Sequence, residues 1–594
     1  MNTASSCRPR LLSITLGSAL IAGAAFAPGS AALASSDTRA SASTTGVALA
    51  PTDPCPAAYP VNQLTRGQVV DGLTVDEGTT PAPFSGEVIG TLRDGIAPGI
   101  EMIMVELSSP AIDEAGGVWS GMSGSPVYAE DGRLIGAVAY GLAWGGSPVA
   151  GVTPASAMYD IGATTAAAPD SIPVTKEAQK RLVADAQVST EQAADGFQRL
   201  PVPLGLSGVN PRQARAFGEL IDSRLDLGQA FASGAVAPDD EATAIVPGGN
   251  VAAALSYGDF TLAGVGTTTA VCGSDVLNFG HPFFFEGNTS QSMHSADALY
   301  IQQDSNAPFK VANPGGVAGT ITEDRLAGLK GTLDSGPVTT PVVSTLSNLD
   351  SGRERTGVTE AVTPDWTADI AAFHALVNME RVLDSAGGGV ARTDLTIKGT
   401  TNNGPWSVTI DGVTAERYDL AFLTGFELYE PLYQIMEYPR KEAEITSVTL
   451  NGTVTEEYQA INMVSADIRV KGKWQRLNES NLPRVRSDRY IKMRINGYPY
   501  KSSTKVRQEF TLPPQPRGFT SVELTGGAEG FYEFDFEGEE RTPRTFNRLL
   551  RALRDAPSGA QVGVSLYGRK GVNRATVDMP EATTGYTYGE IIVR

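Results

Sequence analysis

Short apolar runs separated by glycine-rich turns recur along this chain and limit its fold more than any other feature of the sequence. Such runs, bounded by turn residues, are typical of strands. With 65 glycine and 37 proline residues among 594, the chain also has the turn residues that many short strands require. The clearest runs occupy residues 86–90, 102–105, 134–138, 394–398, 406–410 and 490–495. We therefore predict a mainly β protein, with barrel or sandwich strands over 57–160 and 243–340.

A few segments show helical signals instead. The most distinct begins at Thr363, where Pro364 and Asp365 open an amphipathic pattern that ends at the glycine triplet 387–389. Further helices are predicted over 174–187, 211–223, 418–437 and 543–555. We expect one β domain over 57–340, a helical connector over 341–390, and β-rich accessory domains with a few helices over 391–594.

The N-terminal segment has the pattern of a secretory signal peptide. Arg8 and Arg10 precede an apolar stretch over 11–27, and an A-x-A cleavage site ends at Ala34. Residues 35–56 are rich in Ser, Thr, Ala and Pro, which indicates a disordered linker. We expect a secreted protein, extracellular or on the cell surface, with no integral membrane segment in the mature chain.

The cysteine content and the net charge limit the state of the cysteines and the kind of partner the protein can have. Cys7 leaves with the signal peptide, so Cys55 and Cys272 stay in an oxidising compartment, either as a disulfide or as two buried thiols. We predict the disulfide. The formal net charge of −20 argues against a general role in nucleic-acid binding.

Residues 121–126 read GMSGSP and carry the clearest chemical signal. A serine between glycines on a tight turn is how chymotrypsin-like peptidases present a nucleophile, although a plain glycine-rich turn is the alternative. Only three histidines are available as a base. His281 follows the strand-like run 275–279 and lies between Gly280 and Pro282, so its backbone is restricted. His374 lies in a predicted helix among apolar residues, which favours a core role, and His294 shows no clear signal.

Two blocks of this chain resemble the SpoIVB-type serine peptidases. The first is GGVWSGMSGSPVY at 116–128, followed by DGRLIGAV at 131–138. The second is GVGTTT at 264–269, followed by Gly280 and His281. The resemblance covers roughly 65–340 and implies a chymotrypsin-like double β-barrel over 57–340. It also implies that Ser123 is the nucleophile and His281 the base.

The chain departs from that family in two ways. The family's histidine block precedes its serine block, whereas here Ser123 precedes His281, which suggests a circular permutation. The family's aspartate stands fourteen residues before the nucleophile, a place that Ser109 takes here. A serine can orient an imidazole but cannot offset its positive charge. The third triad member is therefore left open, with Ser109, Asp113, Glu106 and Asp275 as candidates.

These residues imply a mechanism without metal or cofactor. Ser123 would attack a peptide carbonyl while His281 takes its proton, and the backbone N–H groups of Gly121 and Ser123 would hold the oxyanion. Trp144 could line the substrate cleft or simply pack. We expect a secreted serine endopeptidase acting on a protein or peptide. The alternative is a weak or inactive homologue that works as a cell-surface binding or scaffold protein. An esterase is a third hypothesis.

One C-terminal segment is basic in this acidic chain. Residues 468–509 contain twelve Lys or Arg and three acidic residues. Arg469, Lys471 and Lys473 alternate, so on one strand they would share a face. That face could bind an anionic cell-surface polymer or be an ordinary solvated surface.

Overall fold

The structure is a computed structural model that describes most of the chain after residue 54. The described residues are 55–142, 145–162, 171–185, 188–209, 230–237, 239–304, 307–438, 443–527, 543, 545–569 and 571–594. The expected signal peptide, nearly all of the expected linker, Trp144 and the expected helix over 211–223 lie outside them. The described part is mainly β, as predicted.

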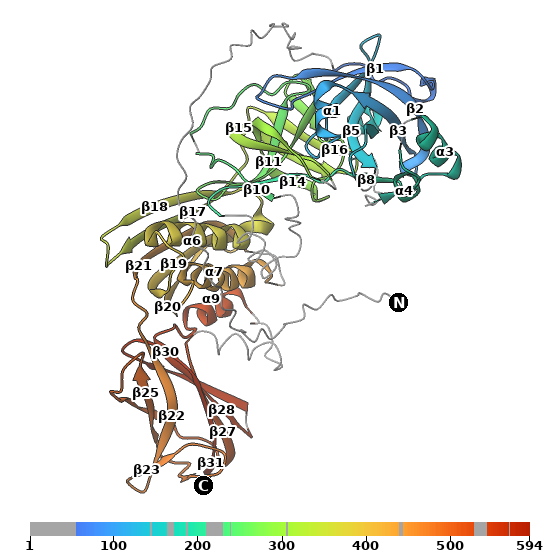
Figure 1. Cartoon of the computed structure of the whole chain (residues 1–594). Helices are drawn as coiled ribbons and strands as arrows, with labels where there is room; N and C mark the ends of the chain where they lie inside the picture. Colours follow the sequence, from blue (N-terminus) through green and yellow to red (C-terminus); the bar gives the residue numbers. More distant parts are fainter. Residues whose placement is uncertain are drawn as a thin grey trace, which may run out of the picture. The chain divides into compact units, whose positions relative to one another are not determined.

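The first group of strands closes into a six-stranded antiparallel barrel. Neighbouring strands follow the order β4-β1-β2-β3-β6-β5, and β4 also pairs with β5, which closes the ring. Figure 1 shows this barrel in blue and cyan. Its strands are β1 (Val69–Thr74), β2 (Ala82–Ala97), β3 (Ile100–Ser108), β4 (Pro126–Ala129), β5 (Leu134–Leu142) and β6 (Val149–Pro154).

Short elements flank this barrel and extend its sheet. Strand β8 pairs with β5, and β7 pairs with β8. The flanking elements are η1 (Val61–Gln63), α1 (Pro110–Ala115), α2 (Ala155–Tyr159), β7 (Ser171–Ile172), α3 (Lys176–Asp185), α4 (Thr190–Asp195) and β8 (Phe197–Arg199). Helix α3 lies within the predicted segment 174–187.

The second group of strands closes another six-stranded antiparallel ring, shown in green in Figure 1. The order is β12-β13-β16-β15-β14-β11, and β11 pairs back with β12. Its strands are β11 (Asn250–Gly258), β12 (Leu262–Cys272), β13 (Asp275–Asn278), β14 (Gly287–Gln302), β15 (Phe309–Arg325) and β16 (Gly328–Leu333). Two short strands, β9 (Leu204–Leu206) and β10 (Ala230–Ala232), extend the sheet at β12.

Strand β11 is buried along its whole length because both of its faces are covered. Val251 and Ala253 pack with Phe279 and Met293 in one cluster. Ala252 on the opposite face packs in another, with residues such as Val311. A continuous apolar run with small side chains is what a strand covered on both faces requires.

The segment expected to be a helical connector differs from that expectation. It holds strands β17 (Thr340–Asn348) and β18 (Glu354–Ala361) as well as helix α6 (Thr367–Leu383). Strand β17 pairs in parallel with β21, so the sheet runs across the boundary expected at 390. The remaining elements of this layer are β19 (Gly389–Thr401), β20 (Gly404–Glu416), α7 (Leu420–Met436) and β21 (Glu444–Thr455). The predicted helices over 363–387 and 418–437 correspond to α6 and α7.

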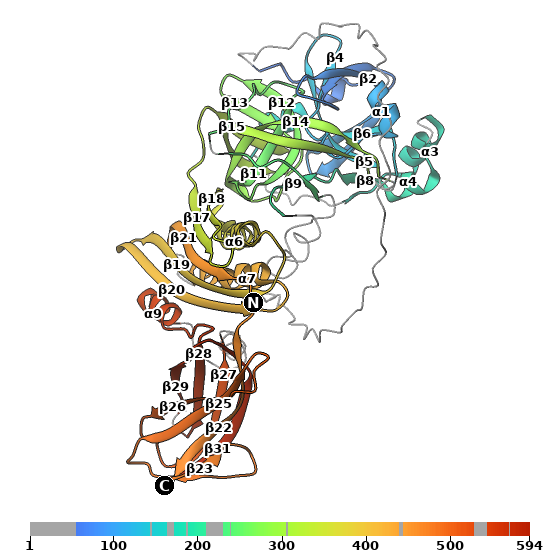
Figure 2. The ribbon, with the colours of Figure 1, turned by 60° about the vertical axis from the view of Figure 1, so that its left-hand side comes forward.

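The C-terminal residues form two five-stranded sheets around one apolar core, drawn in orange and red in Figure 2. The strands are β22 (Ala460–Val470), β23 (Lys473–Arg476), β24 (Arg484–Val485), β25 (Ile491–Pro499), β26 (Val506–Leu512), β27 (Gly518–Gly526), β28 (Gln561–Gly568), β29 (Gly571–Asp578), β30 (Ala582–Thr584) and β31 (Tyr586–Val593). Helix α9 (Phe546–Arg554) packs instead with the core of the preceding layer. Helix α9 lies within the predicted segment 543–555.

The expectation that Arg469, Lys471 and Lys473 share one strand face is wrong. Strands β22 and β23 form a hairpin in which Val470 pairs with Lys473. Lys471 and Gly472 make the turn, with φ values of 46° and 80°. Two consecutive positive φ values are typical of a two-residue hairpin turn, so the alternation spans a turn rather than a strand.

The structure joins Cys55 and Cys272, the predicted pair, in a disulfide. The bond ties the start of the described chain to the end of β12, across 217 residues of sequence. It therefore links the segment leading into the first barrel to a strand of the second.

We expect removal of this disulfide to destabilise the protein. A Cys55→Ser, Cys272→Ser double variant should lose about 2–5 kcal/mol of unfolding free energy, because a long closed loop restricts the unfolded chain. The midpoint of urea unfolding, followed by tryptophan fluorescence, measures this loss. Under a strong reductant the two proteins should unfold alike, and equal midpoints without reductant would contradict the prediction.

Candidate active site

The loop that carries Ser123 joins helix α1 to strand β4 in the first barrel. Its path is fixed on the first barrel by two hydrogen bonds with β5, in which Gly124 N–H donates to the Val138 carbonyl and Val138 N–H to the Ser125 carbonyl, at 2.8 and 3.0 Å. Ser125 Oγ donates to Thr74 Oγ1 at 2.9 Å. Ser125 thus shapes the loop and is itself buried.

The same loop is held from the second barrel by strand β12. Thr267 N–H donates to the Ser123 carbonyl at 2.8 Å, and its hydroxyl donates to the Gly121 carbonyl at 2.9 Å. Thr269 Oγ1 donates to the Gly124 carbonyl at 2.8 Å. The TTT run, which the sequence showed only as part of a family motif, therefore docks the Ser123 loop onto the second barrel.

Glycine is required twice in this loop. Gly121 and Gly124 have φ values of 97° and 100°, in a region that L side chains rarely adopt. A Cβ on Gly124 would lie 1.8 Å from the Thr267 carbonyl oxygen, and one on Gly121 would lie 2.8 Å from Lys310 Cβ. The loop can approach the second barrel this closely only because both side chains are absent.

His281 lies just after β13, on a turn with unusual backbone angles. Phe279 and Gly280 both have positive φ, 67° and 70°, so the chain reverses sharply before the histidine. The Gly280 carbonyl accepts a hydrogen bond of 2.6 Å from Thr153 Oγ1 of the first barrel. A phenylalanine in the left-handed region is uncommon, and such strain is often found at functional sites.

The structure brings Ser123 and His281 into direct contact. Ser123 Oγ and His281 Nε2 are 2.7 Å apart, and His281 Nδ1 is 2.8 Å from the Pro282 carbonyl oxygen. A carbonyl can only accept, so Nδ1 carries the proton. Nε2 is then the free lone pair, and Ser123 donates its hydroxyl hydrogen to it. This is the geometry of a serine paired with a general base.

Two backbone N–H groups of this loop have no acceptor in the part of the chain that the structure describes. The N–H groups of Met122, Gly124 and Ser125 donate to the carbonyls of Trp119, Val138 and Met122. Among the hydrogen bonds of the described residues, none involves the N–H of Gly121 or of Ser123. An unpaired N–H on the serine itself and another two residues before it are donors of the kind that an oxyanion hole needs.

The pair is enclosed in this structure. Ser123 is 1% exposed and His281 is 0% exposed. Burial lowers the pKa of His281 to about 3, and the nearby charge of Arg199 lowers it too, while the bond to Pro282 acts in the opposite direction. The imidazole is therefore neutral at pH 7 and can accept a proton, but the imidazolium is costly in this environment.

Three of the sequence candidates for the third triad member, Ser109, Asp113 and Asp275, are engaged elsewhere or exposed. Ser109 caps α1, where its hydroxyl accepts a hydrogen bond of 3.2 Å from Ile112 N–H. Asp113 is exposed on α1, whereas His281 is fully buried. Asp275 pairs with Lys330 at 3.2 Å. A backbone carbonyl, that of Pro282, takes the hydrogen bond from His281 Nδ1, so Ser109 does not orient the imidazole there.

The other two histidines have different environments. His374 is buried in α6 between Thr359 Oγ1 and Ser344 Oγ, at 2.8 and 2.9 Å, which is the core role expected for it. His294 Nδ1 donates to the Gly315 carbonyl at 2.8 Å, and its Nε2 has no partner among the described residues. No serine hydroxyl of the described residues is bonded to His294.

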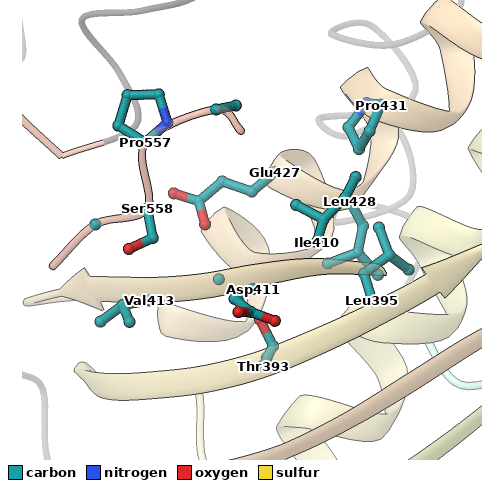
Figure 3. A pocket seen from close by; sticks show the side chains of 13 residues that line it. Thr393, Leu395, Ile410, Asp411, Val413, Glu427, Leu428, Pro431, Pro557 and Ser558 are labelled. Carbon is teal, nitrogen blue, oxygen red and sulfur yellow. The ribbon is translucent and has the colours of Figure 1, made fainter. Parts of the chain in front are cut away.

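A small cavity elsewhere is lined by β19, β20, helix α7 and residues 556–559 (Figure 3). Its volume is about 50 Å³, and neither Ser123 nor His281 lines it. Glu427, whose side chain points into it, accepts a hydrogen bond from Thr414 Oγ1 and so has a structural partner. We assign no chemistry to this cavity.

The described residues hold neither a metal-binding cluster nor a membrane-spanning helix. No group of three or more His, Cys, Asp or Glu side chains there is arranged to hold a metal ion. None of the helices in the same part of the chain has both the length and the apolar character of a membrane span.

Comparisons of the chain with protein-family models, with curated proteins and with solved structures gave no match.

Proposed function

We propose that this protein is a secreted serine endopeptidase with a chymotrypsin-like pair of barrels in permuted order. The observation that carries the proposal is the 2.7 Å contact between Ser123 Oγ and His281 Nε2. It lies where two closed six-stranded rings meet, with the serine on one and the histidine on the other. The pair agrees with the resemblance to SpoIVB-type peptidases, and the Ser-before-His order with the inferred permutation.

The residues supply each step of acyl transfer. Ser123 Oγ bonds to the carbonyl carbon of the substrate while its proton moves to His281 Nε2. The carbonyl electron pair moves onto oxygen, where the N–H groups of Gly121 and Ser123 donate to it, each typically worth about 3 kcal/mol. His281 then gives the proton to the leaving amine as the C–N bond breaks. Water repeats the sequence to release the acid and restore Ser123.

The test is covalent labelling of the purified chain with a fluorophosphonate, read by mass spectrometry of the labelled peptide. We expect one adduct, on Ser123, and none in a Ser123→Ala variant. Ser125→Ala is the matched control, since Ser125 is a buried serine of the same loop that bonds Thr74 rather than a histidine. Labelling that persists in Ser123→Ala would overturn the proposal.

A protein substrate separates a peptidase from an esterase. Cleavage of unfolded casein, lost in Ser123→Ala, is expected of the peptidase. If the protein hydrolysed small esters but left casein intact, the site would be that of an esterase instead.

The runner-up, an inactive homologue that acts as a binding or scaffold protein, is favoured by one observation. Both members of the pair are buried, and a histidine whose pKa is near 3 is a weak base. Absence of labelling in a folded, monodisperse preparation would select this reading. Binding of an anionic cell-surface polymer by the basic segment 468–509 stays a prediction within either reading. Some of its cations already have partners, as in the Arg494–Asp467 and Arg486–Asp488 ion pairs.

A further inference from the structure

The peptide group between Pro282 and Phe283 is hydrogen bonded at both ends. Its carbonyl accepts from His281 Nδ1 at 2.8 Å. Its N–H donates to Asp324 Oδ1, also at 2.8 Å. The second oxygen of the same carboxylate accepts from Phe284 N–H at 2.7 Å. One peptide unit thus separates the imidazole from a carboxylate that no sequence argument had singled out as catalytic.

The geometry of a peptide group makes this arrangement directional. A non-proline peptide bond is almost always trans, so its C=O and N–H point in opposite directions. The carboxylate and the imidazole therefore lie on opposite sides of one rigid, polarisable unit. A negative charge on the N–H side increases the electron density on the carbonyl oxygen, and hydrogen bonds in such chains strengthen one another. The carbonyl becomes a better acceptor for Nδ1–H.

Asp324 is buried and has no cationic partner. It is 0% exposed on β15, and among the described residues it forms no ion pair. Burial raises its pKa to about 6, and the charge of Glu286 raises it too, whereas the N–H donors of Phe283, Phe284 and Glu286 lower it. Above that pH the carboxylate is a net negative charge directed at the His281 turn.

We propose that Asp324 is the acid of this site and acts on His281 through the Pro282–Phe283 peptide group. This inference rests on the proposed function. Asp324 is a positioning residue, because it touches neither the substrate nor the reacting atoms. It holds the turn, fixes the tautomer with the proton on Nδ1, and stabilises the imidazolium that forms when Ser123 loses its proton. Asp324 itself stays ionised throughout.

A variant that removes the charge of Asp324 with little change of its shape tests the proposal. In the full chain, Asp324→Asn should slow fluorophosphonate labelling of Ser123 by roughly 10–100-fold, less than the ~10⁴ lost when an acid in direct contact is removed. Asp324→Glu, which keeps the charge, should recover part of the rate. Asp259→Asn is the matched control. Asp259 is a largely buried carboxylate that accepts Val358 N–H at 3.0 Å and pairs with Arg355 and Arg381, without contact to His281.

The pH dependence of the labelling rate distinguishes an electrostatic role of Asp324 from a purely structural one. In the native chain the labelling rate should fall as the pH drops through about 6, because Asp324 takes up a proton there. The Asp324→Asn variant should lack this acid limb, so its labelling rate should not fall as the pH drops through about 6. The neighbouring charges are Glu286 before β14, Glu323 and Arg325, which pair with each other, and Lys330 on β16. The charge of Arg199, on β8, also acts on His281.

The outcomes separate this inference from the proposed function. Absence of labelling in the native chain would contradict both the proposed function and the role of Asp324. Native labelling, with Asp324→Asn labelled at the same rate and with the same acid limb, would overturn the role of Asp324 and leave the serine nucleophile in place. Equal slowing in Asp324→Asn and Asp259→Asn, at equal loss of thermal stability, would show a structural effect and also overturn it. Slowing confined to Asp324→Asn, with the limb lost, supports it.

Discussion

Replacing His281 by glutamine should slow fluorophosphonate labelling of Ser123 by about 10²–10⁴-fold, the usual contribution of a general base. Glutamine roughly preserves the volume of the ring but cannot take up the proton that Ser123 must lose. The 2.7 Å contact makes His281 Nε2 the acceptor for that proton in this structure. The second-order labelling rate at pH 8, normalised to folded protein, measures the effect.

His294 offers a matched control for that variant. It too is a buried histidine whose Nδ1 donates to a backbone carbonyl at 2.8 Å, and burial lowers its pKa to about 4. It has no bond to a serine, so His294→Gln should change the labelling rate by less than twofold. If His281→Gln were labelled at the native rate, Ser123 would owe its reactivity to another group, and the serine–histidine mechanism would be wrong.

The pairing of Ser123 with His281 could be predicted because both residues are part of local motifs. The glycines around Ser123 are needed for a turn of positive φ, and Gly280 and Pro282 restrict the chain around His281. Such requirements leave a signal in the sequence itself. The mainly β fold could be predicted for the same reason, since apolar runs and turn residues are local properties.

The third partner could not be predicted in the same way. The acceptor on His281 Nδ1 is a main-chain carbonyl, and every residue has one. Asp324 acts from β15, 41 positions after Phe283, on a backbone N–H that any non-proline residue would provide. Ser109 was one candidate because it stands where the family has its aspartate. Ser109 followed by Pro110 is also a common helix start, and the structure shows that role.

The contacts between the two barrels could not be predicted from the sequence either. Thr267 and Thr269 hold a loop about 145 positions earlier, and a threonine in a strand is usually explained by strand propensity alone. These contacts matter because Ser123 and His281, the proposed nucleophile and base, belong to different barrels. The reactive geometry therefore depends on how closely the Ser123 loop approaches β12, and Gly124 lies at the tightest point of that approach.

Gly124→Ala should therefore have a large effect on both stability and reactivity. The new Cβ would lie 1.8 Å from the Thr267 carbonyl oxygen and 2.6 Å from Phe279 N, so the loop and β12 have to separate. The positive φ and the overpacking should together cost roughly 3–5 kcal/mol of unfolding free energy. A shift of about 1 Å between serine and histidine should also slow labelling by about 10²-fold.

Gly132→Ala isolates the steric part of this effect. Gly132 has a φ of 79°, yet a Cβ there would meet nothing within 4 Å, so only the backbone penalty of about 1–2 kcal/mol applies. Urea unfolding of both variants and their labelling rates give the comparison. We expect Gly132→Ala to be labelled at the native rate and Gly124→Ala to lose both stability and label. Equal stability of the two variants would mean that the barrels are not packed tightly at Gly124, and the alignment of Ser123 with His281 would then need another cause.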